Sequence, residues 1–95
     1  MLLCEAALGD CNPLIHANFN ASSLPAGKMS THGLGRMVPN PAEFVKMADG
    51  TVVPCGRLIQ DPQAHQRSLQ FNEYISYQVE HVRIRFLVVM RFKFK

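Results

Sequence analysis

Apolar side chains occupy every second position in the last part of the chain, at Val82, Ile84, Phe86, Val88, Met90, Phe92 and Phe94. The intervening positions are mostly Arg and Lys. A period of two places alternate side chains on opposite faces of a pleated strand. β-Branched and aromatic residues favour the strand over a helix. The pattern therefore predicts a long strand over residues 82–94, with one apolar face and one largely cationic face.

A shorter strand-like run, residues 71–79, precedes it. In an extended conformation Glu73 shares a face with Phe71, Ile75 and Tyr77. Burial of an unpaired carboxylate costs several kcal/mol, on the order of any desolvated charge. Glu73 therefore either reaches water at a strand end or is held by partners at a site, and the local sequence leaves both readings open.

The rest of the chain is divided by Pro and Gly into short pieces. Residues 2–8 are typical of a buried or edge strand. Asp49-Gly50, between β-favouring runs at 44–47 and 51–53, predicts a hairpin. Gly33-Leu34-Gly35 lacks the third glycine of a dinucleotide fingerprint. It is better explained as a bend where glycine permits unusual backbone angles.

Two polar stretches are expected to be loops. Residues 12–26 are turn-rich, with Leu14, Ile15 and Phe19 expected to hold the loop to the core. Residues 56–70 are expected to form an exposed loop leading into the strand at Glu73. The fold class predicted is mainly β, built from antiparallel strands and hairpins.

Composition limits the possible functions. Ninety-five residues allow one small domain, and 47% hydrophobic residues exclude a disordered composition. The net charge of +3 is concentrated near the C-terminus and is best read as the solvated face of the last strand. Three cysteines without C-x-x-C spacing and four scattered histidines argue against a disulfide framework or a metal site.

We expect the chain to have neither a leader nor a membrane span. Met1-Leu2-Leu3-Cys4-Glu5 lacks a basic region and makes a poor signal peptide. The apolar run 86–90 is too short to cross a bilayer. We therefore expect an intracellular protein without membrane partners.

Several motifs follow one another in a familiar order. They are Leu-Leu-Cys-Glu-Ala-Ala-Leu-Gly at 2–9, Leu-Pro-Ala-Gly-Lys at 24–28, Ser-Thr-His-Gly-Leu-Gly-Arg at 30–36, Asp-Gly-Thr-Val-Val-Pro at 49–54, and Asn-Glu-Tyr-Ile-Ser-Tyr at 72–77. In order and spacing they resemble the C-terminal part of the catalytic domain of the poly(ADP-ribose) polymerases, closest to the DNA-dependent nuclear branch. The resemblance covers almost all of residues 1–95. It implies that the upstream half of an α+β catalytic domain is absent here.

The resemblance also implies an activity and a catalytic residue. The family transfers ADP-ribose from NAD, its substrate, and its catalytic glutamate falls at Glu73. Phe71 stands where a tyrosine is common, and Arg36 where a lysine is. Thr31-His32-Gly33 aligns with the Gly-Leu-Gly loop and not with the family's upstream His-Gly motif.

The family's NAD-binding His and Tyr motifs would lie before Leu2, so the resemblance assigns no cofactor-binding residue and no metal to this fragment. We expect it to be inactive alone. The partners implied are protein acceptors and ADP-ribose chains, with DNA contacted only through modules not found here, and the location implied is the nucleus. The alternative is a non-catalytic β-rich interaction module or truncated remnant.

Overall fold

The computed structural model describes residues 1–93, which form short strands joined by turns. Strands account for 41% of these described residues, which confirms the mainly β fold class. The strands are β1 (Leu2–Ala6), β2 (Cys11–Leu14), β3 (Ser30–Gly33), β4 (Gly35–Pro39), β5 (Val45–Lys46), β6 (Val52–Val53), β7 (Leu58–Gln60), β8 (Leu69–Phe71), β9 (Glu73–Ser76) and β10 (Val82–Leu87). Three 3₁₀ turns are η1 (Pro41–Glu43), η2 (Ala64–Gln66) and η3 (Val79–His81).

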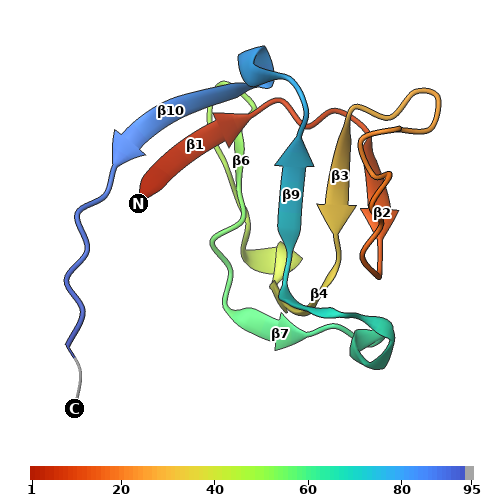
Figure 1. Ribbon diagram of the computed structural model, residues 1–95. Coiled ribbons are helices and arrows are strands. Elements are labelled where there is room, and N and C mark those ends of the chain that lie inside the picture. Colours follow the sequence, from red (N-terminus) through yellow and green to blue (C-terminus); the bar gives the residue numbers. More distant parts are fainter. Residues whose placement is uncertain (94–95) are drawn as a thin grey trace.

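The strands form four small sheets (Figure 1). Their orders are β1-β10, β2-β3-β9, β7-β4-β8 and β5-β6. Antiparallel pairing predominates, but β2 runs parallel to β3 and β4 runs parallel to β8. Turn residues in the sequence identify hairpins, whereas parallel partners need a crossover that turn signals do not encode.

The last strand is shorter than its alternating pattern suggests. β10 ends at Leu87, and the prediction of a strand over 82–94 is wrong for residues 88–93. Phe94 lies outside the described residues. Strand pairing with β1 extends only to Leu2↔Leu87. Two hydrogen bonds follow it, from the Val88 N–H to the Met1 carbonyl at 2.8 Å and from the Met1 ammonium to the Val88 carbonyl at 3.0 Å. Alternation provides two faces, but a strand also needs a neighbour for its hydrogen bonds.

The predicted strand over 71–79 is two strands that belong to different sheets. β8 pairs with β4, β9 pairs with β3, and Asn72 separates them. The run ends at Ser76, and Val79 lies in η3. The break determines where Glu73 begins its strand.

Both stretches expected to be loops contain strands. Residues 11–14 form β2 and residues 58–60 form β7, and each pairs with a strand distant in sequence. Phe19 does not hold its loop to a core, because its side chain is fully exposed. Local turn propensity was outweighed in these places by pairing with β3 and β4.

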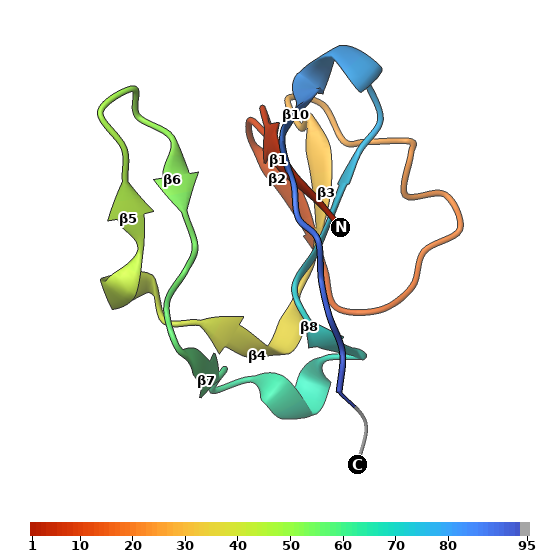
Figure 2. The same ribbon diagram turned by 90° about the vertical axis from the view of Figure 1, so that its left-hand side faces the viewer.

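The Asp49-Gly50 hairpin is confirmed. β5 and β6 pair antiparallel, and Figure 2 shows them standing apart from the sheet that contains β3. Gly50 has φ 90°, a left-handed conformation that glycine adopts without steric cost. The Asp49 Oδ1 accepts from the Thr51 N–H at 2.9 Å and closes the turn.

Very little apolar surface is buried within these residues. Ala64 is the only buried hydrophobic residue of the described part, whereas Leu3, Ile84 and Phe86 are all more than half exposed. The accessible surface is 7684 Å², against about 5,500 Å² for a folded monomer of this mass. The radius of gyration is 14.9 Å, against about 12 Å for a compact domain of this length. The fold therefore presents about 2,200 Å² more surface than a self-contained domain does.

Candidate functional site

Glu73 is the first residue of β9 and pairs with Gly33 on β3. Its neighbours on the same face are Ile75 and, across the strand pair, Thr31. The Glu73 side chain is exposed. Of the two alternatives that the sequence left open, the carboxylate therefore takes the first and reaches water at the end of a strand. The sequence predicted that Glu73, Ile75 and Tyr77 share one face. The structure agrees, because Tyr77 hydrogen-bonds Thr31 on that face, with 2.7 Å between the two hydroxyl oxygens.

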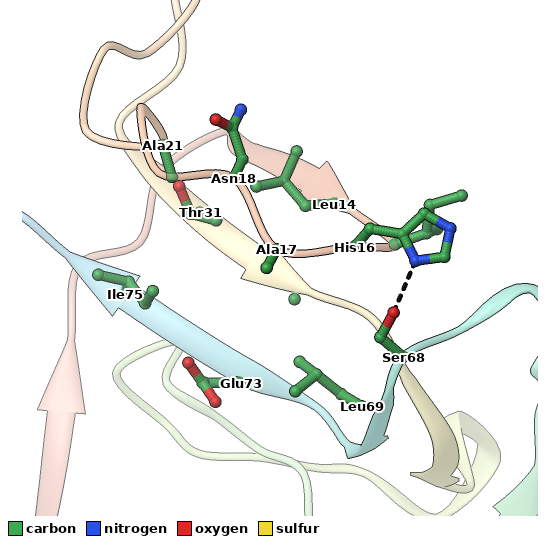
Figure 3. Close-up of a pocket in the computed structure, with 12 residues that line it drawn as sticks. Leu14, His16, Ala17, Asn18, Ala21, Thr31, Ser68, Leu69, Glu73 and Ile75 are labelled. Atoms are coloured by element: carbon green, nitrogen blue, oxygen red, sulfur yellow. Dashed lines mark hydrogen bonds between the residues drawn. The ribbon is translucent and has the colours of Figure 1, made fainter.

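A pocket of about 280 Å³ lies over this face (Figure 3). Among residues 1–93, Glu73 is the only carboxylate that lines it, and the rest of its wall is largely apolar. The wall is formed by Leu14, Ile15, His16, Ala17, Asn18, Ala21, Thr31, Gly33, Ser68, Leu69, Glu73 and Ile75. Pockets for drug-sized ligands measure about 300–1,000 Å³. This one therefore has room for a single sugar or small ring, not for a whole dinucleotide.

The loop after β2 forms one wall of the pocket and is tied to the segment before β8. The His16 Nδ1 and the Ser68 Oγ lie 2.6 Å apart, as the dashed line in Figure 3 marks. The Ser68 N–H also donates to the Ile15 carbonyl at 3.1 Å. Sequence reasoning missed this pair, because no local pattern links side chains that are 52 residues apart.

The reverse face of the same strands carries different chemistry. His32 stacks on Tyr74 with ring centroids 4.2 Å apart and an angle of 22° between the planes. Burial raises the pKa of the Tyr74 phenol, and the nearby Cys11 thiol adds to the effect. The His32 Nε2 is buried without a hydrogen-bond partner among the described residues. His32 therefore faces away from Glu73, consistent with not assigning it to the family's His-Gly motif.

The glycines beside the site are required for close packing. The bend between β3 and β4 occurs at Leu34 as expected, but neither Gly33 nor Gly35 has a positive φ. A Cβ on Gly33 would lie 2.6 Å from the Leu69 Cδ1, and one on Gly35 would lie 2.3 Å from the Phe71 carbonyl carbon. The predicted reason, unusual backbone angles, is wrong; the real one is contact with β8 and β9.

Among residues 1–93 no group of three or more His, Cys, Asp or Glu side chains is arranged to hold a metal ion. No helix in this part of the chain is long and apolar enough to span a membrane.

Comparison with known proteins identifies the family. The sequence model of the family described as the poly(ADP-ribose) polymerase catalytic domain matches residues 1–92. The chain therefore belongs to the poly(ADP-ribose) polymerase catalytic domain family.

Individual relatives match over the whole chain. It is 43% identical over 95 residues to poly [ADP-ribose] polymerase 2 of Arabidopsis thaliana, covering 100% of the chain and 15% of that protein. It is 45% identical over 95 residues to poly [ADP-ribose] polymerase 2-B of rice, covering 100% of the chain and 16% of that protein. It is 44% identical over 98 residues to human poly [ADP-ribose] polymerase 2, covering 99% of the chain and 16% of that protein. The chain thus spans about one sixth of the length of these relatives.

Proposed function

We propose that this chain is the C-terminal part of an NAD-dependent ADP-ribosyltransferase domain and carries its catalytic carboxylate, Glu73. The observation that supports the proposal is the place of Glu73: it occupies the family's Asn-Glu-Tyr-Ile position and is the only carboxylate in an otherwise largely apolar pocket. NAD is the substrate in this proposal, and poly(ADP-ribose) synthesis on protein acceptors and growing chains is the reaction.

The environment of Glu73 suits this chemistry. Breaking the bond between nicotinamide and its ribose leaves positive charge on the sugar. Cleavage releases neutral nicotinamide and moves the positive charge from its ring onto the sugar. A carboxylate beside the sugar in an apolar wall stabilises this transition state more than the ground state. The same group can accept a proton from an incoming hydroxyl as a general base. A pocket of about 280 Å³ fits the sugar at which this happens.

We assign the remaining contacts to NAD to the part of the relatives' catalytic domain that lies before the segment matched by this chain. The pocket holds only a fragment of a dinucleotide, and the exposed apolar side chains of β1 and β10 offer a surface for that part to cover. The isolated chain is accordingly expected to show negligible turnover. A nuclear location, and activation through DNA-sensing modules outside these residues, complete the proposal.

The test is a chimera in which this chain replaces the matching 95-residue segment of the Arabidopsis relative. The unmodified chimera should synthesise poly(ADP-ribose). Glu73→Gln removes the negative charge with almost no change of shape and should abolish elongation while leaving most NAD binding intact. Glu80→Gln, an exposed carboxylate in η3, is the matched control and should elongate normally.

Two results would contradict the proposal. Polymer of unchanged length from Glu73→Gln would remove Glu73 from its role, and an inactive unmodified chimera would remove the chain from the transferase class. Labelled NAD offered to the isolated chain should give no automodification. Glu73-dependent labelling there would overturn the inference that the chain needs upstream residues.

The excess exposed surface also favours a second candidate, a β-rich module that binds another chain and performs no chemistry. Exposed strand edges carry unpaired N–H and C=O groups, which promote such pairing. The coding sequence upstream of Met1 distinguishes the two. An in-frame His-Gly motif and tyrosine-bearing stretch support the transferase, whereas a stop codon or unrelated sequence supports the module.

A further inference from the structure

Asn72 occupies the corner at which the chain passes from one sheet to another. Before it β8 pairs with β4, and after it β9 pairs with β3. The corner is closed by the side chain: the Asn72 Oδ1 accepts from the Gly35 N–H at 2.9 Å, between residues 37 positions apart. Glu73 follows directly.

The corner leaves no space for adjustment. Gly35 is buried, and a Cβ there would lie 2.5 Å from the Asn72 nitrogen, a backbone atom that no rotamer change can move. On its other side, the Gly35 carbonyl faces the Arg67 guanidinium, with Nη1 at 3.4 Å. Side chains thus bind both backbone polar groups of Gly35. The Asn72 bond ties the start of β9 to the start of β4, and the Arg67 contact ties the segment before β8 to it.

This contact matters because of strand register. β9 pairs with β3 over only four residue pairs, from Ser30↔Ser76 to Gly33↔Glu73. A slip of one residue exchanges the two faces of a strand. It would turn Glu73 away from the pocket and bring Tyr74 toward it. A contact at the corner, next to the Gly33↔Glu73 pair, opposes that slip where the carboxylate is positioned.

We propose that Asn72 is a positioning residue for Glu73, which holds the carboxylate toward the pocket through its bond to the Gly35 amide. The inference rests on the proposed function, since it concerns the geometry of the same reaction. Asn72 does not line the pocket. Its effect should therefore appear in kcat, because Glu73 acts on the transition state, and much less in the KM for NAD.

The experiment uses the chimera and three Asn72 variants. Asn72→Ala removes the acceptor, and we expect kcat to fall about 10- to 100-fold, as for a displacement near 1 Å, with KM for NAD changed less than about threefold. Asn72→Asp retains Oδ1 and should restore kcat to within about fivefold of the unmodified chimera. In Asn72→Ser the hydroxyl is too short to reach the Gly35 amide, so this variant should behave like Asn72→Ala. It replaces Asn72→Ala in the experiment if the alanine variant does not fold.

The matched control is Asn40→Ala, which breaks a bond of the same kind, from the Ala42 N–H to the Asn40 Oδ1 at 3.1 Å, away from the pocket. It should leave kcat unchanged. A second readout is hydrogen exchange of the peptide containing Gly35, which should be at least about tenfold faster in Asn72→Ala and in Asn72→Ser than in the unmodified chimera or in Asn72→Asp.

The outcomes separate the two ideas. If Glu73→Gln abolishes elongation while both Asn72→Ala and Asn72→Ser keep kcat within about threefold, the positioning role is wrong and the proposed function stands. Equal losses in Asn72→Ala and Asn40→Ala would show general destabilisation and also overturn it. If Glu73→Gln elongates normally, the proposed function fails; unchanged exchange at Gly35 in Asn72→Ala refutes the contact itself.

Discussion

Gly35 tests whether close packing, and not backbone freedom, explains the glycines beside the site. In Gly35→Ala the added Cβ would lie 2.3 Å from the Phe71 carbonyl carbon, 2.5 Å from the Asn72 nitrogen and 2.7 Å from the Phe71 Cα. All three are backbone atoms, so β4 must move away from Phe71 and Asn72 by about 1 Å to restore ordinary contact. Overpacking of this kind costs about 1–3 kcal/mol or more, and the rigid neighbours argue for the upper end.

Gly27→Ala is the control, because it meets nothing within 4 Å but has φ 82°. Left-handed backbone costs an alanine about 1–2 kcal/mol. The two substitutions therefore add the same methyl group but destabilise the fold for different reasons: steric contact at Gly35 and backbone strain at Gly27. Gly35→Ala should lose at least about 1 kcal/mol more than Gly27→Ala if contact with the backbone of Phe71 and Asn72 is the dominant effect.

Tyrosine fluorescence during urea unfolding measures the difference. The chain has two tyrosines, Tyr74 and Tyr77, and no tryptophan, so the signal reports β9 and the residue after it. With a urea slope of about 1–3 kcal/mol per molar, Gly35→Ala should lower the midpoint well below that of Gly27→Ala or abolish the transition. Equal midpoints for the two variants would refute the close-packing explanation.

Two further predictions concern the strand pairs. Arg83 and Arg85 hydrogen-bond Glu5 across the β1–β10 pair and lower the pKa of its carboxyl below the ordinary 4.5. The ionised Glu5 therefore stabilises the folded chain above pH 4.5, and this contribution is lost as the pH falls through the lowered pKa of the folded state. Glu5→Gln should thus be less stable than the natural chain at pH 7, and the difference should shrink as the pH falls below 4.5; a gap in urea midpoints that stays constant as the pH is lowered would contradict the assignment. On the pocket face, Tyr77→Phe and Thr31→Val each break the 2.7 Å hydroxyl contact, and a double-mutant cycle should give a coupling of about 1 kcal/mol, whereas strictly additive losses would show that the bond contributes nothing.

The candidate site was only partly predictable. The sequence singled out Glu73 through its motif, and the period of two correctly grouped it with Ile75 on one face. The loop wall, including His16, and the Ser68 that binds it carried no recognisable signal. Their contact joins segments with unrelated local sequence, and only the folded chain brings them together.

Local sequence determined those features whose causes are local: the mainly β class, the Asp49-Gly50 hairpin with its left-handed glycine, and the alternating faces of β9 and β10. Tertiary structure determined the features that depend on a partner. It ended β10 at Leu87, the last residue that pairs with β1, and it made strands of residues 11–14 and 58–60. It also broke the run at Asn72, because β4 and β3 hold its two halves in different sheets. A residue's own preferences set what it can form, but the position of a neighbouring backbone decides where that structure starts and stops.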